Sequence, residues 1–271
     1  MRGRGGGIAA GGGLIGVVAL VAYLLLGGDP SQVNLDALQN QRVGPGQSAG
    51  QLSECQTGAD ANERQDCRVL GYINSVQEYW DETFTASGQT YEPADTTFFT
   101  GSVSTGCGQA TSAVGPFYCP PDQMVYIDLG FFDELQSRFG AEGGPFAQAY
   151  VIAHEYDHHI QNLSGTLQNS QDGTGAESGA VRTELQADCF AGAWAGNAVS
   201  TGFLEPLTPE QVGQALSAAE AVGDDRIQER TQGQVNPETW THGSSEQRQQ
   251  WFTTGLETAN PAQCDTFSAD L

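Results

Sequence analysis

The chain has 271 residues, with 10 Lys plus Arg against 33 Asp plus Glu, and its formal net charge is −23 at pH 7. So acidic a surface repels nucleic-acid phosphates and anionic lipid head groups, which argues against a nucleic-acid-binding role. A chain of this length is expected to build one sizeable core rather than several domains.

The first 28 residues contain two arginines, no acidic residue and an uncharged run from Ile8 to Leu26. This run has 19 residues, close to the ~20 that a helix needs to cross a bilayer. Because positive charge lies only on its N-terminal side, it predicts a single transmembrane anchor, with residues 29–271 outside the cytoplasm. The alternative is a cleaved signal peptide, but no A-x-A-like cleavage site follows the run.

Residues 29–60 are polar, rich in Gly and Gln and without periodicity, and they predict a flexible linker. Residues 61–271 are expected to form one extracytoplasmic domain. Its first helix is predicted over residues 61–84, where apolar residues recur at three- and four-residue steps. Short strands are predicted at TTFFTGSV (96–103) and QMVYIDL (123–129), separated by a segment rich in turn-forming residues.

Helices are predicted over most of the remaining chain. They cover residues 131–139, 145–163 and 180–199, and a fourth begins after Thr208. Thr208 is the expected N-cap, with Pro209 at the first helical position and Gln211 completing a capping box. The expected fold class is therefore α+β, predominantly helical with a small sheet.

Six cysteines in an exported chain predict three disulfides. Cys55 with Cys67 and Cys107 with Cys119 would each close a short local loop, which leaves Cys189 to pair with Cys264. Fifteen pairings are formally possible. Zinc ligation by cysteine is the rival interpretation, but the sequence contains no C-x-x-C pair.

The segment VIAHEYDHHIQ, residues 151–161, holds three of the four histidines. On a helix, His154 and His158 project from one face and can aim ring nitrogens at one point. Glu155 lies to the side, where it can take a proton from a water bound to the metal. His159 points elsewhere and is expected to face solvent or to serve as a hydrogen-bond partner. The alternative is that these histidines only form structural hydrogen bonds.

A catalytic zinc site needs a third protein ligand. Glu184 and Asp188 are four residues apart on the predicted helix 180–199 and share one of its faces. Glu184 is the predicted ligand, and Asp188 the predicted partner for the second N–H of a ligating histidine. A solvated acidic face is the alternative, although Asp188 lies in an otherwise apolar run.

Three segments, HEYDHHIQ, ELQADCFAGAWA and WTHGSSEQRQQWF, together resemble the bacterial putative neutral zinc metallopeptidase family. The resemblance extends over roughly residues 60–268, includes TGCGQATSAVGPFYCPPDQMVYIDL, and matches the family's single N-terminal membrane segment. It implies a zincin-like domain of the gluzincin kind. Carried over residue by residue, it implies that His154, His158 and Glu184 are the zinc ligands and that Glu155 is the general base.

One position departs from the family pattern, in which the residue before the second histidine is usually glycine. Here it is Asp157. Its carboxylate could weaken the power of the zinc ion to acidify water, or it could face solvent without effect.

His242, in WTHGSS, is the remaining histidine. It is a candidate catalytic residue that would stabilise the oxyanion of a tetrahedral intermediate, with a structural role as the alternative. Arg226, in AVGDDRIQ, is expected at a helix end, paired with an acidic neighbour, and calcium binding by this segment is the alternative.

These observations predict a single-pass, membrane-anchored zinc metallopeptidase that cleaves peptide or protein substrates outside the cytoplasm. An edge strand near residues 123–129 would align the substrate chain by main-chain hydrogen bonds. Two alternatives stay open. One is a zinc-binding envelope interaction domain with weak or no catalysis, and the other is an acidic envelope interaction protein without a metal.

Overall fold

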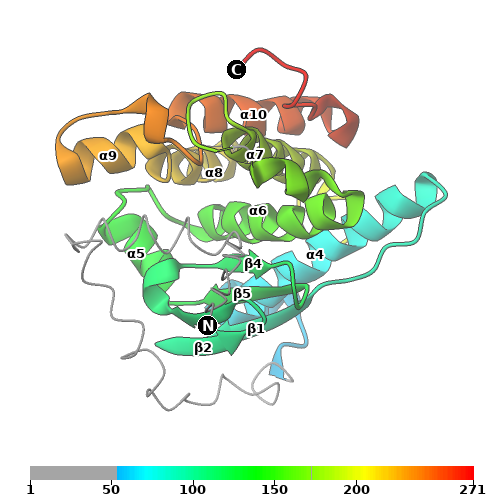
Figure 1. The fold of residues 1–271 in the computed structure, drawn as a ribbon. Helices are drawn as coiled ribbons and strands as arrows, with labels where there is room; N and C mark the ends of the chain where they lie inside the picture. The colour runs from blue at the N-terminus through cyan, green and yellow to red at the C-terminus, as the bar shows by residue number, and fades with distance from the viewer. Residues whose placement is uncertain (1–53, 172) are drawn as a thin grey trace, which may run out of the picture.

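A computed structural model describes residues 54–171 and 173–271 of the chain (Figure 1). The predicted anchor at residues 8–26 and the predicted linker from residue 29 to 53 lie outside the described residues. Within the described part, no helix combines the length and the hydropathy required to cross a membrane.

Two helices stand at the start of the described chain, α3 (Gly58–Glu63) and α4 (Gln65–Ala86). Thr57 caps α3 in a capping box with Asp60. The prediction of one continuous helix over 61–84 is wrong at its first turn, because Arg64 takes an extended conformation between the two helices. The prediction that the linker runs to residue 60 is also wrong, since α3 begins at Gly58. Helix α4 buries the predicted apolar stripe, including Val69, Val76 and Trp80.

A three-stranded sheet supports the helices. Its strand order is β1 (Asp95–Phe99), β5 (Met124–Asp128) and β4 (Phe117–Cys119). β1 runs parallel to β5, whereas β4 runs antiparallel to it. The predicted strand at 123–129 is therefore confirmed, but its prediction as an edge strand is wrong. The two edge strands of this sheet are β1 and β4, and β4 was not predicted as a separate strand.

A separate two-stranded antiparallel sheet consists of β2 (Ser102–Thr105) and β3 (Gly108–Thr111). The single strand predicted over 96–103 is thus divided between two sheets. The chain bends between them at Gly101, whose φ of +82° lies in the left-handed region that glycine adopts without strain.

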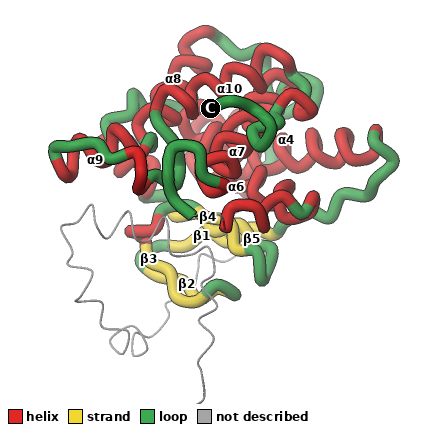
Figure 2. Tube along the Cα trace, turned by 45° about the horizontal axis from the view of Figure 1, so that its top comes forward, coloured by secondary structure: helices red, strands yellow, loops and turns green. Residues whose placement is uncertain are grey.

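Helix α6 lies between the three-stranded sheet and a layer of further helices (Figures 1 and 2). The remaining helices are α5 (Phe131–Ser137), α6 (Pro145–Ser164), α7 (Gly179–Asn197), α8 (Pro209–Ala221), α9 (Asp224–Gln232) and α10 (Ser245–Thr258). Short 3₁₀ turns lie at Ser112–Val114, Thr166–Gln171, Pro237–Thr239 and Pro261–Gln263. The predicted α+β class is confirmed, as is the Thr208 capping box.

Helices α7 and α10 pack with their backbones in direct contact. A Cβ atom on Gly255 would lie 1.9 Å from the carbonyl oxygen of Cys189, and one on Gly192 would lie 2.0 Å from that of Phe252. Only glycine fits at both positions, so the two helices come close enough for α10 side chains to reach polar groups of α7.

All three disulfides match the predicted pairing, which joins Cys55 to Cys67, Cys107 to Cys119 and Cys189 to Cys264. The first two close local loops. The third joins α7 to the C-terminal segment across 75 residues. It therefore holds that segment against the helix that carries Glu184 and Asp188.

Candidate metal centre

Helix α6 carries the histidine motif through the interior of the protein. Pro145 occupies its first turn, and Gly165 ends it in the left-handed conformation. Because the sheet lies on one side and α7 and α8 on the other, residues on nearly every face of α6 are buried. His154 and His158 are one turn apart, and their rings meet edge to face with centroids 4.8 Å apart. The face that they share is directed toward α7.

Glu184 of α7 meets both imidazoles. The His154 Nε2 atom lies 3.1 Å from one of its carboxylate oxygens, and the His158 Nε2 atom lies 3.6 Å from the other. One ligand atom from each of the three residues lies within 4.8 Å of the other two. The structure thus brings together the three predicted ligands, from two helices that are separate in sequence. The side chains of His158 and Glu184 are 13% and 19% exposed, so solvent can reach the group.

Asp188 lies behind His154, as the spacing predicts. Its Oδ1 atom is 2.9 Å from the His154 Nδ1 atom and accepts a hydrogen bond from the Tyr150 hydroxyl at 2.5 Å. Arg248 of α10 donates to both Asp188 oxygens, through Nε at 2.8 Å and Nη2 at 2.9 Å. Sequence reasoning missed Arg248, although it lies within the WTHGSSEQRQQWF segment. The fully buried Asp188 is therefore paired with a buried cation.

These charges set the protonation of His154. Burial opposes ionisation of Asp188, but Arg248 and His154 hold the pKa of this carboxyl below its ordinary value. Burial likewise disfavours the imidazolium form of His154, yet Asp188 and Glu184 raise the pKa of His154 to about 10. The metal-free site therefore holds a proton where a cation would bind.

Glu155 lies at the junction of α6 and the edge strand β4. Burial raises the pKa of Glu155 to about 7, and Glu184 adds to the rise. The positive charge of His154 and, more weakly, a hydrogen bond from the Tyr118 main chain oppose it. A carboxyl group with this pKa can both accept and return a proton near neutral pH.

His242 lies in the loop before α10 and is 9% exposed. Asp224, at the first position of α9, holds this loop: its Oδ2 atom accepts main-chain hydrogen bonds from Thr241, His242 and Gly243 at 2.7, 2.7 and 3.1 Å. Burial opposes protonation of His242, but Asp224 and Glu184 raise its pKa. Glu184 thus acts on His242 as well as on the two motif histidines. Sequence reasoning missed this role of Asp224, because neither interpretation of AVGDDRIQ, as a helix end or as a calcium site, connects it to the loop that carries His242.

His159 and Asp157 lie on the faces of α6 turned away from this centre. His159 is fully buried, with Nε2 2.7 Å from the Glu92 carbonyl oxygen and Nδ1 3.0 Å from the Tyr118 hydroxyl. Its predicted role as a hydrogen-bond partner is confirmed, and solvent exposure is excluded. Asp157 is also fully buried and accepts a 2.9 Å hydrogen bond from Trp80. The expectation that Asp157 could face solvent is wrong.

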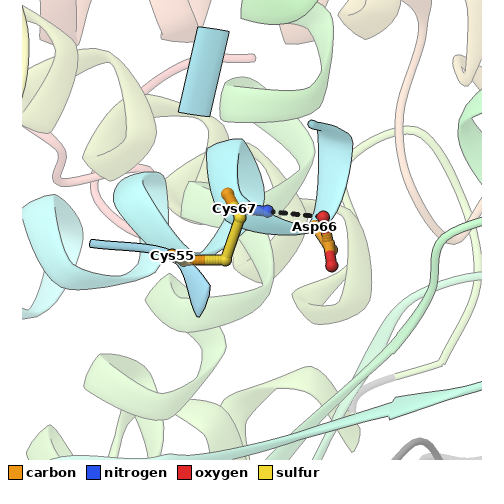
Figure 3. A group of neighbouring side chains, drawn as sticks. All are labelled: Cys55, Asp66 and Cys67. Carbon is orange, nitrogen blue, oxygen red and sulfur yellow. Dashed lines mark hydrogen bonds between the residues drawn. A yellow bond between two sulfur atoms is a disulfide. The ribbon is translucent and has the colours of Figure 1, made fainter. Parts of the chain in front are cut away.

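A second group, Cys55, Asp66 and Cys67, has metal-ligand residue types in close proximity (Figure 3). Its two sulfur atoms are bonded to each other, however, and the Asp66 carboxylate accepts a hydrogen bond from the main chain of Cys67. A disulfide has no thiolate to offer a metal. This group is therefore structural.

Arg226 has the partner expected of it. Its Nη2 atom lies 2.7 Å from a carboxylate oxygen of Glu220, and both side chains are largely exposed. The pair joins the end of α8 to the start of α9.

The donor set of two imidazoles and one carboxylate is the set found in catalytic zinc sites with an open fourth position. A structural zinc site would instead surround the ion with four protein ligands, usually cysteines and histidines. The described cysteines are all engaged in disulfides. The residues present therefore fit a catalytic type of zinc centre.

Comparison with known proteins points the same way. A family model described as putative neutral zinc metallopeptidase matches residues 1–267. An uncharacterized protein of Mycobacterium tuberculosis (strain H37Rv), Rv2575, is 52% identical over 258 residues, which cover 91% of this chain and 85% of the relative. The uncharacterized protein YpfJ of Escherichia coli K12 is 41% identical over 238 residues, which cover 81% and 82%. No solved structure matches the chain.

Proposed function

Since the chain belongs to the putative neutral zinc metallopeptidase family, we propose that it is a membrane-anchored zinc metallopeptidase that hydrolyses peptide bonds outside the cytoplasm. The observation that carries this proposal is the convergence of His154, His158 and Glu184, with ligand atoms within 4.8 Å of one another. The uncharged run from Ile8 to Leu26 supports membrane attachment. The acidic surface supports peptide or protein substrates over nucleic acid.

In this mechanism His154, His158 and Glu184 hold the zinc ion, which when bound supplies Lewis-acid activation of water and of the substrate carbonyl. Glu155 accepts a proton from the attacking water and returns it to the leaving amine. Its pKa of about 7 in the metal-free protein suits both transfers near neutrality. Asp188 fixes the orientation of His154 through the 2.9 Å contact with Nδ1.

His242 and the edge strand complete the proposed site. A protonated His242, held by Asp224, donates a hydrogen bond to the oxygen that becomes negative during attack. β4 ends the sheet and lies against α6 beside Glu155, so its main chain is positioned to align an extended substrate. Strand β5, expected to do this, is paired on both sides and cannot.

The experiment compares the wild-type chain with Glu155→Gln for zinc content and for cleavage of unstructured proteins. We expect one zinc per chain in both proteins, and a rate loss of about 10²–10⁴-fold in the variant, because proton transfer is removed and the ligands are kept. Persistent cleavage by Glu155→Gln would show that another residue is the base. Absence of stoichiometric zinc in the wild type would refute the metal centre and favour the metal-free interaction protein.

His242→Gln tests the second catalytic assignment. This variant should keep the zinc affinity and lose kcat by about 10²–10³-fold, because it loses a charged hydrogen-bond donor at the reacting oxygen. An unchanged kcat would make His242 a structural loop residue.

A zinc-binding envelope domain without catalysis is an alternative function. The reason to consider it is Asp157, whose carboxyl group directly precedes the ligand His158 in the sequence. The structure weakens the argument that Asp157 impairs catalysis. Asp157 is turned away from the centre, and burial raises its pKa well above the ordinary value, which favours a neutral carboxyl group. If the wild-type chain binds zinc but cleaves nothing in a broad peptide library, this alternative replaces our proposal.

A further inference from the structure

We propose that Gln161 is a positioning residue that holds His158 in the tautomer whose Nε2 atom is free to bind a cation. The part of this inference that concerns the cation rests on the proposed function. The tautomer itself is a property of the protein chain alone. Gln161 lies in the same helix as His158, three residues later, and is fully buried.

The orientation of the Gln161 amide is determined by its neighbours. Its Nε2 atom donates to the main-chain carbonyl oxygen of Thr183 at 2.7 Å and to Oε1 of Gln186 at 3.1 Å. A main-chain carbonyl can only accept hydrogen bonds, so the amide nitrogen, and not the amide oxygen, must face Thr183. The opposite orientation would place two acceptors against each other in the protein interior.

The Gln161 oxygen is consequently turned toward His158. Oε1 lies 2.8 Å from the His158 Nδ1 atom. Because an amide oxygen can only accept, Nδ1 must carry the proton. A neutral imidazole has one protonated nitrogen, so the lone pair lies on Nε2, which faces the Glu184 carboxylate at 3.6 Å.

The chain of hydrogen bonds continues to the C-terminal segment. The Nε2 atom of Gln186 donates to the carbonyl oxygen of Cys264 at 3.0 Å. Cys264 is joined by its disulfide to Cys189 of α7. The relay His158–Gln161–Gln186 therefore ends on main-chain carbonyls that fix its direction. His154, in contrast, is oriented by the carboxylate of Asp188, so the two imidazoles are held by different chemistry.

The direct test is nitrogen NMR of the histidine rings in the metal-free wild-type chain at pH 8. Four histidines make assignment tractable, and a His158→Gln spectrum identifies the resonances in question. We expect His158 to carry its proton on Nδ1, with Nε2 unprotonated. A spectrum with the proton on Nε2 would overturn the inference, and this measurement needs neither zinc nor activity.

A second test measures zinc affinity by competition with a chelator. Gln161→Leu should weaken zinc binding about 10–100-fold, the usual cost of losing a partner behind a metal ligand. The matched control is Gln214→Leu, since Gln214 is also buried and accepts a hydrogen bond from the main chain of the same helix, from Phe146 at 3.0 Å. The control should bind zinc within about twofold of the wild type, because its partner does not touch a ligand.

A folded Gln161→Leu protein with wild-type zinc affinity would contradict the inference. If Gln161→Leu does not fold, the tautomer measurement on the wild type decides the question. If the wild-type chain binds no zinc, the proposed function fails, while the NMR result still confirms or refutes the role of Gln161.

Discussion

His154 lies between two carboxylates, and this position determines how many protons the metal-free site holds. Asp188 contacts its Nδ1 atom at 2.9 Å and Glu184 its Nε2 atom at 3.1 Å. With its pKa raised to about 10, His154 is doubly protonated at pH 8. A cation must displace the proton on Nε2 before it can bind. Burial lowers the pKa of His158, which has no such proton to lose at this pH.

We therefore expect zinc binding at pH 8 to release about one proton per ion. Titration calorimetry in buffers with different ionisation enthalpies measures this number. In Asp188→Asn, where the charge behind His154 is removed, the release should fall because the pKa of His154 falls. Zinc binding without proton release at pH 8 in the wild type would contradict this account of His154.

Asp157, unlike His154, has no partner of opposite charge in hydrogen-bond contact within the described part of the chain. One of its oxygens accepts the Trp80 N–H, whereas Oδ2 has no hydrogen-bond partner among the described residues. Burial raises the pKa of Asp157 well above its ordinary value in the folded protein. In the unfolded chain the pKa is about 3.9. The unfolded state therefore ionises first, and the fold loses stability as pH rises from about 4 toward the pKa of the folded state.

Asp157→Asn removes this loss, because a neutral amide keeps an acceptor for Trp80. The variant's free energy of unfolding should gain on that of the wild type progressively between pH 4.5 and 8, as measured by urea denaturation. Asp60→Asn is the control of opposite sign. Hydrogen bonds from Thr57 lower the pKa of Asp60, so the stability that this carboxylate contributes is already complete above its unfolded-state pKa of about 3.9. Asp60→Asn should therefore be less stable than the wild type by a constant amount between pH 4.5 and 8, and the difference should shrink only at lower pH. A pH-independent difference for Asp157→Asn would contradict the prediction.

At the scale of elements, the contact between α7 and α10 depends on the absence of side chains. Gly255→Ala would place a methyl group 1.9 Å from a main-chain oxygen of α7. We expect it to lower the free energy of unfolding by about 2–3 kcal/mol, because backbone cannot move aside as a side chain can. Gly71→Ala in α4 is the matched control, with nothing within 4 Å of the added carbon. It should raise stability by about 0.5–1 kcal/mol. Equal effects of the two substitutions on urea unfolding would refute the argument.

The sequence predicted the elements unevenly, for physical reasons. Helices α6 and α7 were predicted almost to their ends from their apolar residues, whereas for α8 only the start was predicted, from the cap signals at Thr208. The break at Arg64 was missed because the apolar stripe begins only at Val69, so no periodic pattern shows where the helix starts. Strand β4 has only three residues and follows a glycine turn, so it depends on pairing with β5 rather than on its own pattern.

The residues of the site were also predicted unevenly, because some follow local spacing and others depend on tertiary contacts. His154, Glu155 and His158 follow a spacing that one helix imposes, and the spacing of Glu184 and Asp188 is equally local. Gln161 is in the same helix, but its role depends on Thr183 and Gln186 of another. Arg248 lies 60 residues from Asp188, and Asp224 lies 18 residues from His242, so no local sequence pattern predicts either contact.

At the scale of the whole molecule, the dominant fact is a net charge of −23 on 271 residues. Mutual repulsion among carboxylates destabilises the compact state. The described ion pairs at the surface, such as Arg138 with Glu134 and Arg226 with Glu220, are exposed and individually weak. Added salt shortens the Debye length to about 8–10 Å near 0.1–0.15 M and screens both the repulsion and the ion pairs. Because the repulsion is the larger of the two energies, its relief outweighs the weakening of the pairs.

We expect the melting temperature to rise as NaCl increases from about 0.02 to 0.5 M, with the steepest rise in the lower part of this range. Differential scanning calorimetry measures it, and KCl should give the same result because the effect is one of screening. A melting temperature that is constant or falls with salt would show that local pairs outweigh the overall charge.

The bond between Cys189 and Cys264 has a consequence for the timing of maturation. The last link behind His158 is supplied by a residue 75 positions beyond its disulfide partner. A chain that emerges in order from its N-terminus presents both motif histidines long before that link can form. On the proposed role of Gln161, full zinc affinity would be reached only after oxidation has joined the two sulfurs. Under the proposed function, the chain would therefore gain its peptidase activity only after its synthesis is complete.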